Sequence, residues 1–596
     1  MKTVMMITSL LFCMLARAQT SPVSLTETGD SAVVNDKVYL IITNSTFADA
    51  CYRFADWKRT KGYWTYVLAG SDSYVWTDAN VLSAISSFTE SQGHVDYLLF
   101  VGNSQVPGHV CNYQIDGTNR SFCSDYYYEC RGNTANPPSL RVGRIPVSTN
   151  LEAEAVFDKI IAYEQAPTDC SSFYQTTACT SMLDFRGFPS VYPLDSVYRE
   201  NIRVIRSSEN IHSYLEDSVM APLNVKRIYF SNSPFSTTPY PLGYNNDRYA
   251  QGGTFPPELQ NPGVWTASHD NINDSINSGA LFLTYLGDGN STGWCNDLYG
   301  EIYGDSKVYW QEDTDSLRNY RKYPVICSLA SHTGKYDETT DCPAEFFLKK
   351  DGAGAVAVIA PTDRALDGYR EYMAEGFVNA VWPTPGINQQ YPLTSPVYEL
   401  GDILAVSREW MGNMEFFDTH TLYKADTIRY GHQLDSFHLF GDPSMMMYTE
   451  QPSNFTNVSV RKNGNRLIVD TGEADTKVTF HTPMWETMFY VDSYLGSHVE
   501  YQNEMEGDSM YICIDKHNFV PYIQKWHYRL NIQNETITGT HTYIAEEVNI
   551  GRHVTNDKPQ GDVLIQGANI EIQGGNVTLY PGTTIVNSNV TINRRE

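Results

Sequence analysis

Two apolar runs in residues 278–336 decide the fold: SGALFLTYLGDGNSTGW (278–294) and YPVICSLASHTGKY (323–336). Each run ends in small residues and a turn that contains glycine. This pattern is typical of a buried parallel strand that delivers a loop to the edge of a sheet. Open α/β sheets place their sites where such loops lie side by side. The two runs therefore predict the position of a functional site.

Strands and helices alternate in the first part of the chain. Apolar, β-branched runs predict strands, and apolar residues spaced three and four positions apart predict helices. The expected strands are 37–43, 63–70 and 95–103, and the expected helices are 47–62 and 79–91. This alternation is typical of a parallel sheet with helices on its faces. We expect an α/β fold built from two subdomains, at 37–166 and 167–450.

The periodicity changes after residue 450 and predicts all-β structure. Short runs of alternating apolar residues, separated by turn residues, indicate a β-sandwich at 451–545. A seven-residue repeat follows at 560–593, with the units VLIQGAN, IEIQGGN and VTLYPGT. Its glycines and β-branched pairs exclude a coiled coil. We expect a Gly-rich tail of short stacked β-rungs or hairpins.

Residues 1–18 have the features of a secretory signal peptide. Lys2 precedes an apolar run, and the segment ends in Ala-Arg-Ala. We find no later apolar stretch of transmembrane length, so the protein is expected to be secreted or located at the cell surface. The formal net charge of −27 argues against binding to nucleic acid, because few groups could neutralise phosphates.

Ten cysteines lie beyond residue 18, from Cys51 to Cys513. An even number in an exported protein permits disulfide bonds, and Cys123/Cys130 and Cys170/Cys179 are near enough in sequence to form local pairs. None has the CxxC spacing of a zinc site. Structural bridging or simple burial is the expected role.

Four stretches, in this order, resemble the gingipain-type (family C25) cysteine peptidases. They are DYLLFVGNSQVPGHV (96–110) with SDYYY and LRVGRIPVSTNLEAEAVFDKIIAYEQ behind it, GALFLTYLGDGNSTGW (279–294), PVICSLASHTG (324–334) and FGDPSMMMY (440–448). The resemblance covers roughly residues 37–545. It implies a caspase-like α/β fold, an immunoglobulin-like sandwich behind it, and an exported bacterial endopeptidase. The family commonly binds calcium, whose ligands the resemblance does not assign; no cofactor is required.

Both principal catalytic residues of that family are replaced here. The family's first loop reads Gly-His-Gly, and this chain has Gly287-Asp288-Gly289. The nucleophile position, after an alanine at the end of the second strand, holds Ser331 instead of cysteine. The acid that orients the family's histidine corresponds only loosely to Asp184.

The replacements predict impaired catalysis. A serine hydroxyl needs a base that can hold its proton, and an aspartate side chain, with an ordinary pKa of about 4, is too weak a base at neutral pH. Losing one acid/base group costs about 10²- to 10⁴-fold in rate. Asp288 also adds negative charge where an oxyanion would need stabilisation. Gly287 and Gly289 allow tight turns whether or not catalysis occurs.

Other residues offer alternatives. Cys327 shares a strand face with Ser331 but lies deeper, as a buried thiol or a shifted nucleophile. His332 enters the site only if the backbone turns sharply. Three further histidines could reach the loops from elsewhere, although the third fits a packed or hydrogen-bonded role: His269, His432 and His438. Trp294 and the Tyr-rich segment 232–250 are candidates for a cleft wall or for ordinary packing.

We therefore expect an exported protein with a C25-type domain that is catalytically impaired and acts as a binding or scaffold protein, with a protein or peptide in the cleft. One alternative is an active secreted endopeptidase that uses Ser331 or Cys327 with a histidine recruited from elsewhere. A second is a structural component of a surface complex.

Overall fold

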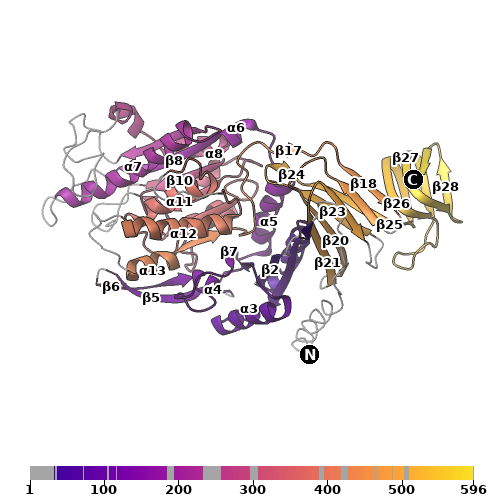
Figure 1. The fold of residues 1–596 in the computed structure, drawn as a ribbon, viewed down its shortest axis with the longest axis horizontal. Coiled ribbons are helices and arrows are strands. Elements are labelled where there is room, and N and C mark those ends of the chain that lie inside the picture. Colours follow the sequence, from indigo (N-terminus) through magenta and orange to yellow (C-terminus); the bar gives the residue numbers. More distant parts are fainter. Residues whose placement is uncertain are drawn as a thin grey trace. The chain divides into compact units, whose positions relative to one another are not determined.

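The computed structural model forms two compact units (Figure 1). It describes residues 32–594 apart from 34–36, 72, 104–105, 116, 184–193, 232–256, 296–306, 388–394, 418–426, 464–465, 486–487 and 503–508. One unit contains Val38–Ala55 and Thr65–Ser453, and the other contains Asp56–Trp64 and the chain from Asn454 onward. Within the described part, no helix is long and apolar enough to cross a membrane.

The larger unit is organised around a ten-stranded sheet. Its strands are, in spatial order, β3 (Tyr63–Gly70), β2 (Lys37–Asn44), β4 (Tyr97–Val101), β7 (Arg141–Ile145), β16 (Phe437–Phe440), β15 (Ala357–Pro361), β14 (Val325–Leu329), β10 (Phe282–Leu286), β8 (Thr176–Leu183) and β9 (Asn224–Ser231). Neighbours run parallel from β2 to β7 and from β15 to β9, whereas β16 is antiparallel to β15. The predicted parallel α/β architecture is confirmed, with both predicted subdomains contributing to one mixed sheet.

The two halves of the sheet meet at β7 and β16. Phe440 of β16 lies opposite Arg144 of β7. A Cβ atom at Gly143 would come within 2.2 Å of the Gly441 carbonyl oxygen. Only glycine permits this close approach of the two backbones. Gly143 and Arg144 of β7 therefore lie where the two halves of the sheet meet, and Gly143 lets the two backbones approach closely.

Helices cover this sheet, and strands such as β4, β10, β14 and β15 are buried along their whole length, as expected when both faces are covered. The helices are α2 (Ala48–Thr60), α3 (Asp78–Gln92), α4 (Tyr126–Glu129), α5 (Asn150–Gln165), α6 (Ser171–Gln175), α7 (Leu194–Asp217), α8 (His269–Ser278), α10 (Pro343–Lys349), α11 (Tyr369–Val381), α12 (Leu400–Phe417) and α13 (Thr427–Ser436). α11 packs against α7 and α12, and α5 packs against α10. A hairpin of β5 (His109–Ile115) and β6 (Thr118–Ser124) contacts α13.

Local sequence explains where these helices begin and end. The Thr149 side chain accepts a hydrogen bond from the Glu152 backbone, and Glu152 caps the Thr149 backbone in return, which starts α5. α2 ends before Gly62, which adopts a φ of 94°. The predicted helices at 47–62 and 79–91 and strands at 37–43, 63–70 and 95–103 are confirmed to within two residues at each end.

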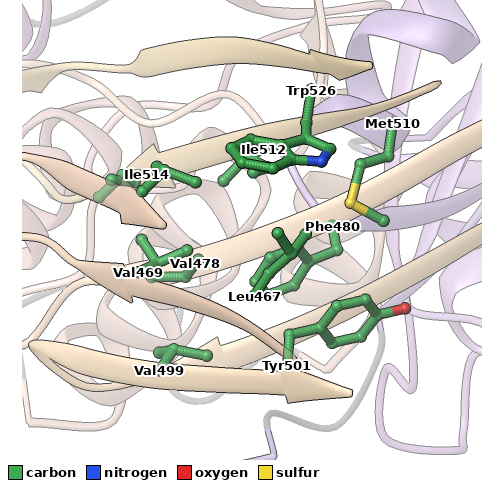
Figure 2. Packing of buried hydrophobic residues seen from close by; sticks show 11 residues of the cluster. Leu467, Val469, Val478, Phe480, Val499, Tyr501, Met510, Ile512, Ile514 and Trp526 are labelled. Atoms are coloured by element: carbon green, nitrogen blue, oxygen red, sulfur yellow. The ribbon is translucent and has the colours of Figure 1, made fainter. Parts of the chain in front are cut away.

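Two sheets pack face to face in the C-terminal unit and share one core (Figure 2). The first holds β18 (Ser459–Asn463), β19 (Arg466–Asp470) and β22 (His498–Gln502). The second includes β21 (Met488–Leu495), β20 (Lys477–Trp485), β23 (Ser509–Asp515) and β25 (Tyr522–Ile532), with β1 (Ala32–Val33) beside β21. Phe480 of β20 stacks on Tyr501 of β22 with 4.0 Å between ring centroids. A short pair, β17 (Ser453–Asn454) and β24 (Phe519–Val520), lies outside both sheets.

The end of α2 belongs to this C-terminal unit and buries a basic run. Lys58, Arg59, Thr60 and Lys61 are at most 8% exposed. Lys61 Nζ lies 2.7 Å from a carboxylate oxygen of Asp515, which is equally buried. The sequence does not predict this burial, because a Lys-Arg-Thr-Lys run ordinarily faces solvent.

The tail continues the second sheet as a parallel stack. β26 (Glu535–Ile550) pairs in parallel with β25 and with β27 (Val563–Leu579), and β27 pairs in parallel with β28 (Thr583–Val586) and β29 (Asn589–Arg594). The first two seven-residue units run along the single strand β27, so the stacked elements are longer than the repeat. The strands are stacked in parallel, without hairpins.

Candidate functional site

The two apolar runs form adjacent strands that end together. β10 and β14 pair in parallel, with Phe282 opposite Val325 and Leu286 opposite Leu329. Their loops, from Gly287 and from Ala330, therefore leave the same edge of the sheet, as predicted. β15 lies on the other side of β14 and also points its carboxyl end to this edge. We call residues 287–290, 330–334 and 363–365 the edge loops.

Gly289 is required by the contact between the first two edge loops. A Cβ atom at Gly289 would lie 2.9 Å from Ala330 Cβ, 2.9 Å from Thr333 Cγ2 and 3.3 Å from the carbonyl oxygen of Ser331. Gly289 belongs to β11 (Asp288–Asn290), which pairs with β12 (Gly293–Cys295) and through it with β13 (Lys307–Trp310). The structure thus brings Asp288 and Ser331 into neighbouring loops.

Asp288 is held by a buried guanidinium. Arg370 Nη1 lies 3.3 Å from Oδ1 of Asp288 and donates a hydrogen bond to the carbonyl oxygen of Gly287 at 2.7 Å. Its Nη2 contacts Asp367 Oδ1 at 2.5 Å. Although burial lowers the pKa of Arg370, the carboxylates of Asp367, Glu371 and Asp288 outweigh it and raise the pKa above its ordinary value. The Asp288 carboxylate is therefore engaged in an ion pair.

Ser331 lies at a sharp turn directly after β14. His332 has a φ of 62°, which places it in the left-handed region. The His332 backbone N–H donates to the carbonyl oxygen of Asp363 at 2.9 Å, and the Ala365 N–H donates to Ser331 Oγ at 3.2 Å. Ser331 is only 6% exposed. The hydroxyl is buried and held by the third edge loop.

His332 faces a carboxylate that it shares with a second histidine. His332 Nε2 lies 3.0 Å from Asp363 Oδ1, and His432 Nε2 lies 2.8 Å from Asp363 Oδ2. Arg120 Nη1 adds a contact of 3.3 Å to Oδ1. Burial raises the pKa of Asp363, but the hydrogen bonds and charges of the two histidines outweigh it and hold the pKa well below its ordinary value. Among the histidines considered as possible bases, His332 and His432 lie at the edge loops in the structure.

Cys327 and Trp294 belong to the core. Cys327 is fully buried between β10 and β15, and burial raises the pKa of its thiol well above the ordinary value. Trp294 is also fully buried; its ring stacks on Tyr285 at 4.3 Å, and its Nε1 donates to Ser328 Oγ at 2.7 Å. Of the alternatives left open from sequence, the burial of both side chains favours a buried thiol at 327 and ordinary packing at 294.

The remaining predicted residues lie elsewhere. His438 is 2% exposed, and burial lowers its pKa to about 4, which fits the packed role. His269 begins α8 and pairs with Asp270 at 3.4 Å. Asp184 and segment 232–250 lie outside the described residues. Cys123, Cys130, Cys170 and Cys179 carry thiols, so neither suggested disulfide is formed.

Three charged residues of the site were missed from sequence: Asp363, Arg370 and Arg120. Asp363 was detectable, because it follows the small-residue strand β15, whose carboxyl end meets the same edge. Arg370 and Arg120 come from α11 and from the β5–β6 hairpin, and no local pattern connects these elements with the loops. Among the described residues, no group of three or more His, Cys, Asp or Glu side chains could hold a metal ion, so we derive no step through calcium.

The sheet order, the paired edge loops and the C-terminal sheets define a mixed α/β fold with a large, mostly parallel sheet and further β sheets behind it. The chain belongs to peptidase family C25, whose family pattern matches residues 33–448. No curated protein matches the chain.

Solved structures with a similar fold include gingipain R. The Arg-specific cysteine proteinase gingipain R (RgpB) matches with a TM-score of 0.58 and 16% identity, over 85% of this chain and 99% of that one. A complex of Porphyromonas gingivalis RgpB pro- and mature domains matches with a TM-score of 0.58 and 17% identity, over 82% and 99% of the two chains. At this identity the likeness concerns the fold.

Proposed function

We propose that this chain is an exported C25 protein that has lost peptidase chemistry and binds a peptide or protein segment at its edge loops. The observation that carries the proposal is the environment of Ser331. Its Oγ accepts the Ala365 N–H, and within the described residues no imidazole lies within hydrogen-bonding distance of it. A nucleophilic serine needs a base in direct contact to take its proton.

The residue at the histidine position cannot supply this base. Asp288 is paired with buried Arg370, which neutralises its carboxylate and fixes its loop. A carboxylate also cannot act as the cationic acid that protonates a leaving amine. Since both tasks of the imidazole are unfilled, hydrolysis by a Ser331/Asp288 pair is not expected.

Partial exposure of the edge loops supports binding. The side chains of His332 and Asp288 are 31% and 17% exposed, and Asn290 and Arg364 are also partly exposed. These loops offer an imidazole, an amide and a guanidinium, which are groups that hydrogen-bond to a peptide. The complex of RgpB pro- and mature domains is a precedent for a protein ligand on this fold. The proposal includes a signal peptide at 1–18 and an immunoglobulin-like sandwich at 451–545.

Binding is tested with a fluorescent peptide library and the purified chain. The wild type should bind a subset of peptides and leave them intact. His332→Ala should weaken binding at least about tenfold, which corresponds to about 1.4 kcal/mol. His269→Ala, a histidine that is 45% exposed at the start of α8, is the matched control and should bind as the wild type does. Equal binding by both variants would remove the edge loops from the proposal.

A second candidate function is hydrolysis by Ser331 with His332 as base and Asp363 as the orienting acid. The left-handed turn at His332 and its 3.0 Å contact with Asp363 favour it, because an imidazole held by a carboxylate is the usual form of a catalytic base. Against it, the Ser331 hydroxyl and the His332 ring are not hydrogen-bonded to each other. Peptide turnover that His332→Ala and Ser331→Ala both abolish would establish this function.

A further inference from the structure

The carboxylate of Asp363 lies among three side chains that can carry positive charge. Its Oδ1 lies 3.0 Å from His332 Nε2 and 3.3 Å from Arg120 Nη1. Its Oδ2 lies 2.8 Å from His432 Nε2. One carboxylate supplies a single negative charge and faces a guanidinium and two imidazoles, so the cluster has the capacity to hold a second anion.

The buried side of this cluster is fixed in place. Gln433 Oε1 accepts the Leu366 N–H at 3.0 Å, and Gln433 Nε2 donates to the Arg364 carbonyl oxygen at 2.9 Å. The same Nε2 lies 2.6 Å from His432 Nδ1, and the Gln433 and His432 side chains are completely buried. His432 therefore holds Asp363 in position before a ligand arrives, which lowers the ordering entropy that binding must overcome.

Arg120 uses only one of its nitrogens in the cluster. Nη1 makes the 3.3 Å contact with Asp363, and among the described residues Nε and Nη2 have no hydrogen-bond partner. Nε is buried, and a buried N–H without an acceptor is costly. The side chain as a whole is 19% exposed, so a ligand can reach the guanidinium. The Nε and Nη2 edge of Arg120 is therefore open to an acceptor.

Other arginines of this chain show what this edge of a guanidinium binds. Nε and Nη2 of Arg144 donate to the two carboxylate oxygens of Asp125 at 2.6 and 2.7 Å. Nε and Nη2 of Arg227 donate to those of Glu209 at 2.8 and 2.9 Å. This two-point geometry matches a carboxylate, and its hydrogen bonds are assisted by charge. The corresponding edge of Arg120 has the same donors and lacks the acceptor.

His332 supplies a second free nitrogen next to Arg120. Its Nδ1 has no hydrogen-bond partner among the described residues, and its side chain is 31% exposed. Because Arg120 Nη1 and His332 Nε2 contact the same oxygen of Asp363, the two side chains are neighbours. Carboxylates on both sides of an imidazole favour its protonated form, which donates from both nitrogens.

We propose that Arg120 and His332 form a carboxylate-binding site beside the edge loops. The site takes an acidic side chain or the C-terminal carboxylate of the bound segment, with Asp363 and His432 as positioning residues. This assignment rests on the proposed function, and it adds the chemical class of the ligand.

Fluorescence anisotropy with three sets of hexapeptides tests the site. Each set is built from uncharged residues with an N-terminal fluorophore. The first set carries one Glu and an amidated C-terminus, the second carries no Glu and a free C-terminal carboxylate, and the third carries neither carboxylate. The wild type should bind the first or the second set at least about tenfold more tightly than the third. Tighter binding of the first set assigns the carboxylate to a side chain, and tighter binding of the second assigns it to a chain end.

Equal affinity for the three sets would overturn the carboxylate site and leave peptide binding at the edge loops intact. Binding of none of the sets would contradict the proposed function as well. Both results come from the wild type, so they do not depend on the folding of a variant.

Arg120→Met should abolish the preference for a carboxylate, because it removes the guanidinium and keeps a side chain of similar length. Arg53→Met is the matched control, because it removes one arginine from an exposed ion pair with Asp158. This control should keep the wild-type preference. A preference that Arg120→Met leaves unchanged, or that Arg53→Met abolishes to the same extent, would contradict the proposal.

Discussion

Arg370 Nη1 lies 3.3 Å from Asp288 Oδ1 and donates to the Gly287 carbonyl oxygen, so a buried guanidinium holds the loop that carries Asp288. The ion pair engages Asp288 in the first edge loop, and the Ala365 N–H donates a hydrogen bond to Ser331 in the second. Asp288 and Ser331, which the resemblance to the family predicts at the catalytic positions, therefore both have structural partners. The account of this protein as a binder that does not hydrolyse peptides depends on these two contacts.

Replacing Arg370 should destabilise the larger unit. Arg370→Met leaves the carboxylates of Asp288 and Asp367 without their buried partner, and breaking a buried pair costs about 3–5 kcal/mol. Urea unfolding measures the loss. Arg461→Met, which removes an exposed ion pair with Asp470, is the control and should cost at most about 1 kcal/mol. Equal losses in both variants would show that the Arg370 contacts do not stabilise the loop.

The Asp363 carboxylate should make stability depend on pH in the acid range. Its folded pKa lies below its unfolded value because the two histidines donate to it. Its contribution is therefore fully present above the ordinary carboxyl pKa of about 4 and is lost as pH falls below it. Asp363→Asn should lower the free energy of unfolding at pH 7 by about 2–3 kcal/mol and flatten its fall below pH 4.

Asp49→Asn is the control for this measurement, because Asp49 is exposed at the start of α2. Its unfolding curve should follow the wild type at each pH. If the asparagine at 363 kept the wild-type acid dependence, Asp363 would not be the titrating group.

His481 should limit stability in mild acid. Burial, with a smaller contribution from Arg59, lowers the pKa of His481 to about 3 in the folded protein, against about 6.5 when unfolded. The unfolded chain therefore binds the extra proton first, and stability is lost as pH falls from 6.5 toward 3, by up to about 1.4 kcal/mol per pH unit. His481→Gln should reduce this slope for the C-terminal unit.

Thermal unfolding between pH 3 and 7 measures the slope for His481→Gln and for the exposed control His553→Gln. The control should retain the wild-type slope. A steeper or unchanged slope in His481→Gln would assign the acid sensitivity to another group.

Lys159 should be essential for the contact of α5 with the end of α10 and the segment that follows it. Its buried Nζ donates to the carbonyl oxygens of Leu348, Ala353 and Ala355 at 2.5, 3.0 and 3.0 Å. Lys159→Met leaves these carbonyl groups buried without their donor, and we expect a loss of about 3 kcal/mol in urea unfolding. Lys350→Met is the control, because Lys350 pairs with Asp315, whose side chain is 80% exposed. A similar small loss in both variants would contradict this role.

Local patterns predicted the elements of this fold well and the contacts between distant elements poorly. The apolar runs at β10 and β14 fixed both the strands and the edge where their loops meet, because a parallel sheet leaves only one arrangement for them. The ion pair of Asp288 with Arg370 joins residues 82 positions apart. Periodicity carries no information about such pairs, and neither does charge.

Contacts between distant elements also determine the features that local patterns did not predict. A sharp turn at His332 cannot be read from His-Thr-Gly, because the φ of 62° is imposed by the hydrogen bond of its N–H with Asp363. Trp294 follows a polar loop, and its sequence left a cleft wall and ordinary packing equally open; the β11–β12 hairpin turns it back onto Tyr285. The burial of Lys61 depends on Asp515, which belongs to the same unit but lies far away in the sequence.

The most direct test of the central claim is hydrolysis of a diverse quenched-peptide library by the purified protein beside Ser331→Ala. The account predicts no turnover by either protein, with both folded by circular dichroism and both still binding peptides from the library. Turnover by the wild type that disappears in Ser331→Ala would contradict it and establish a serine peptidase.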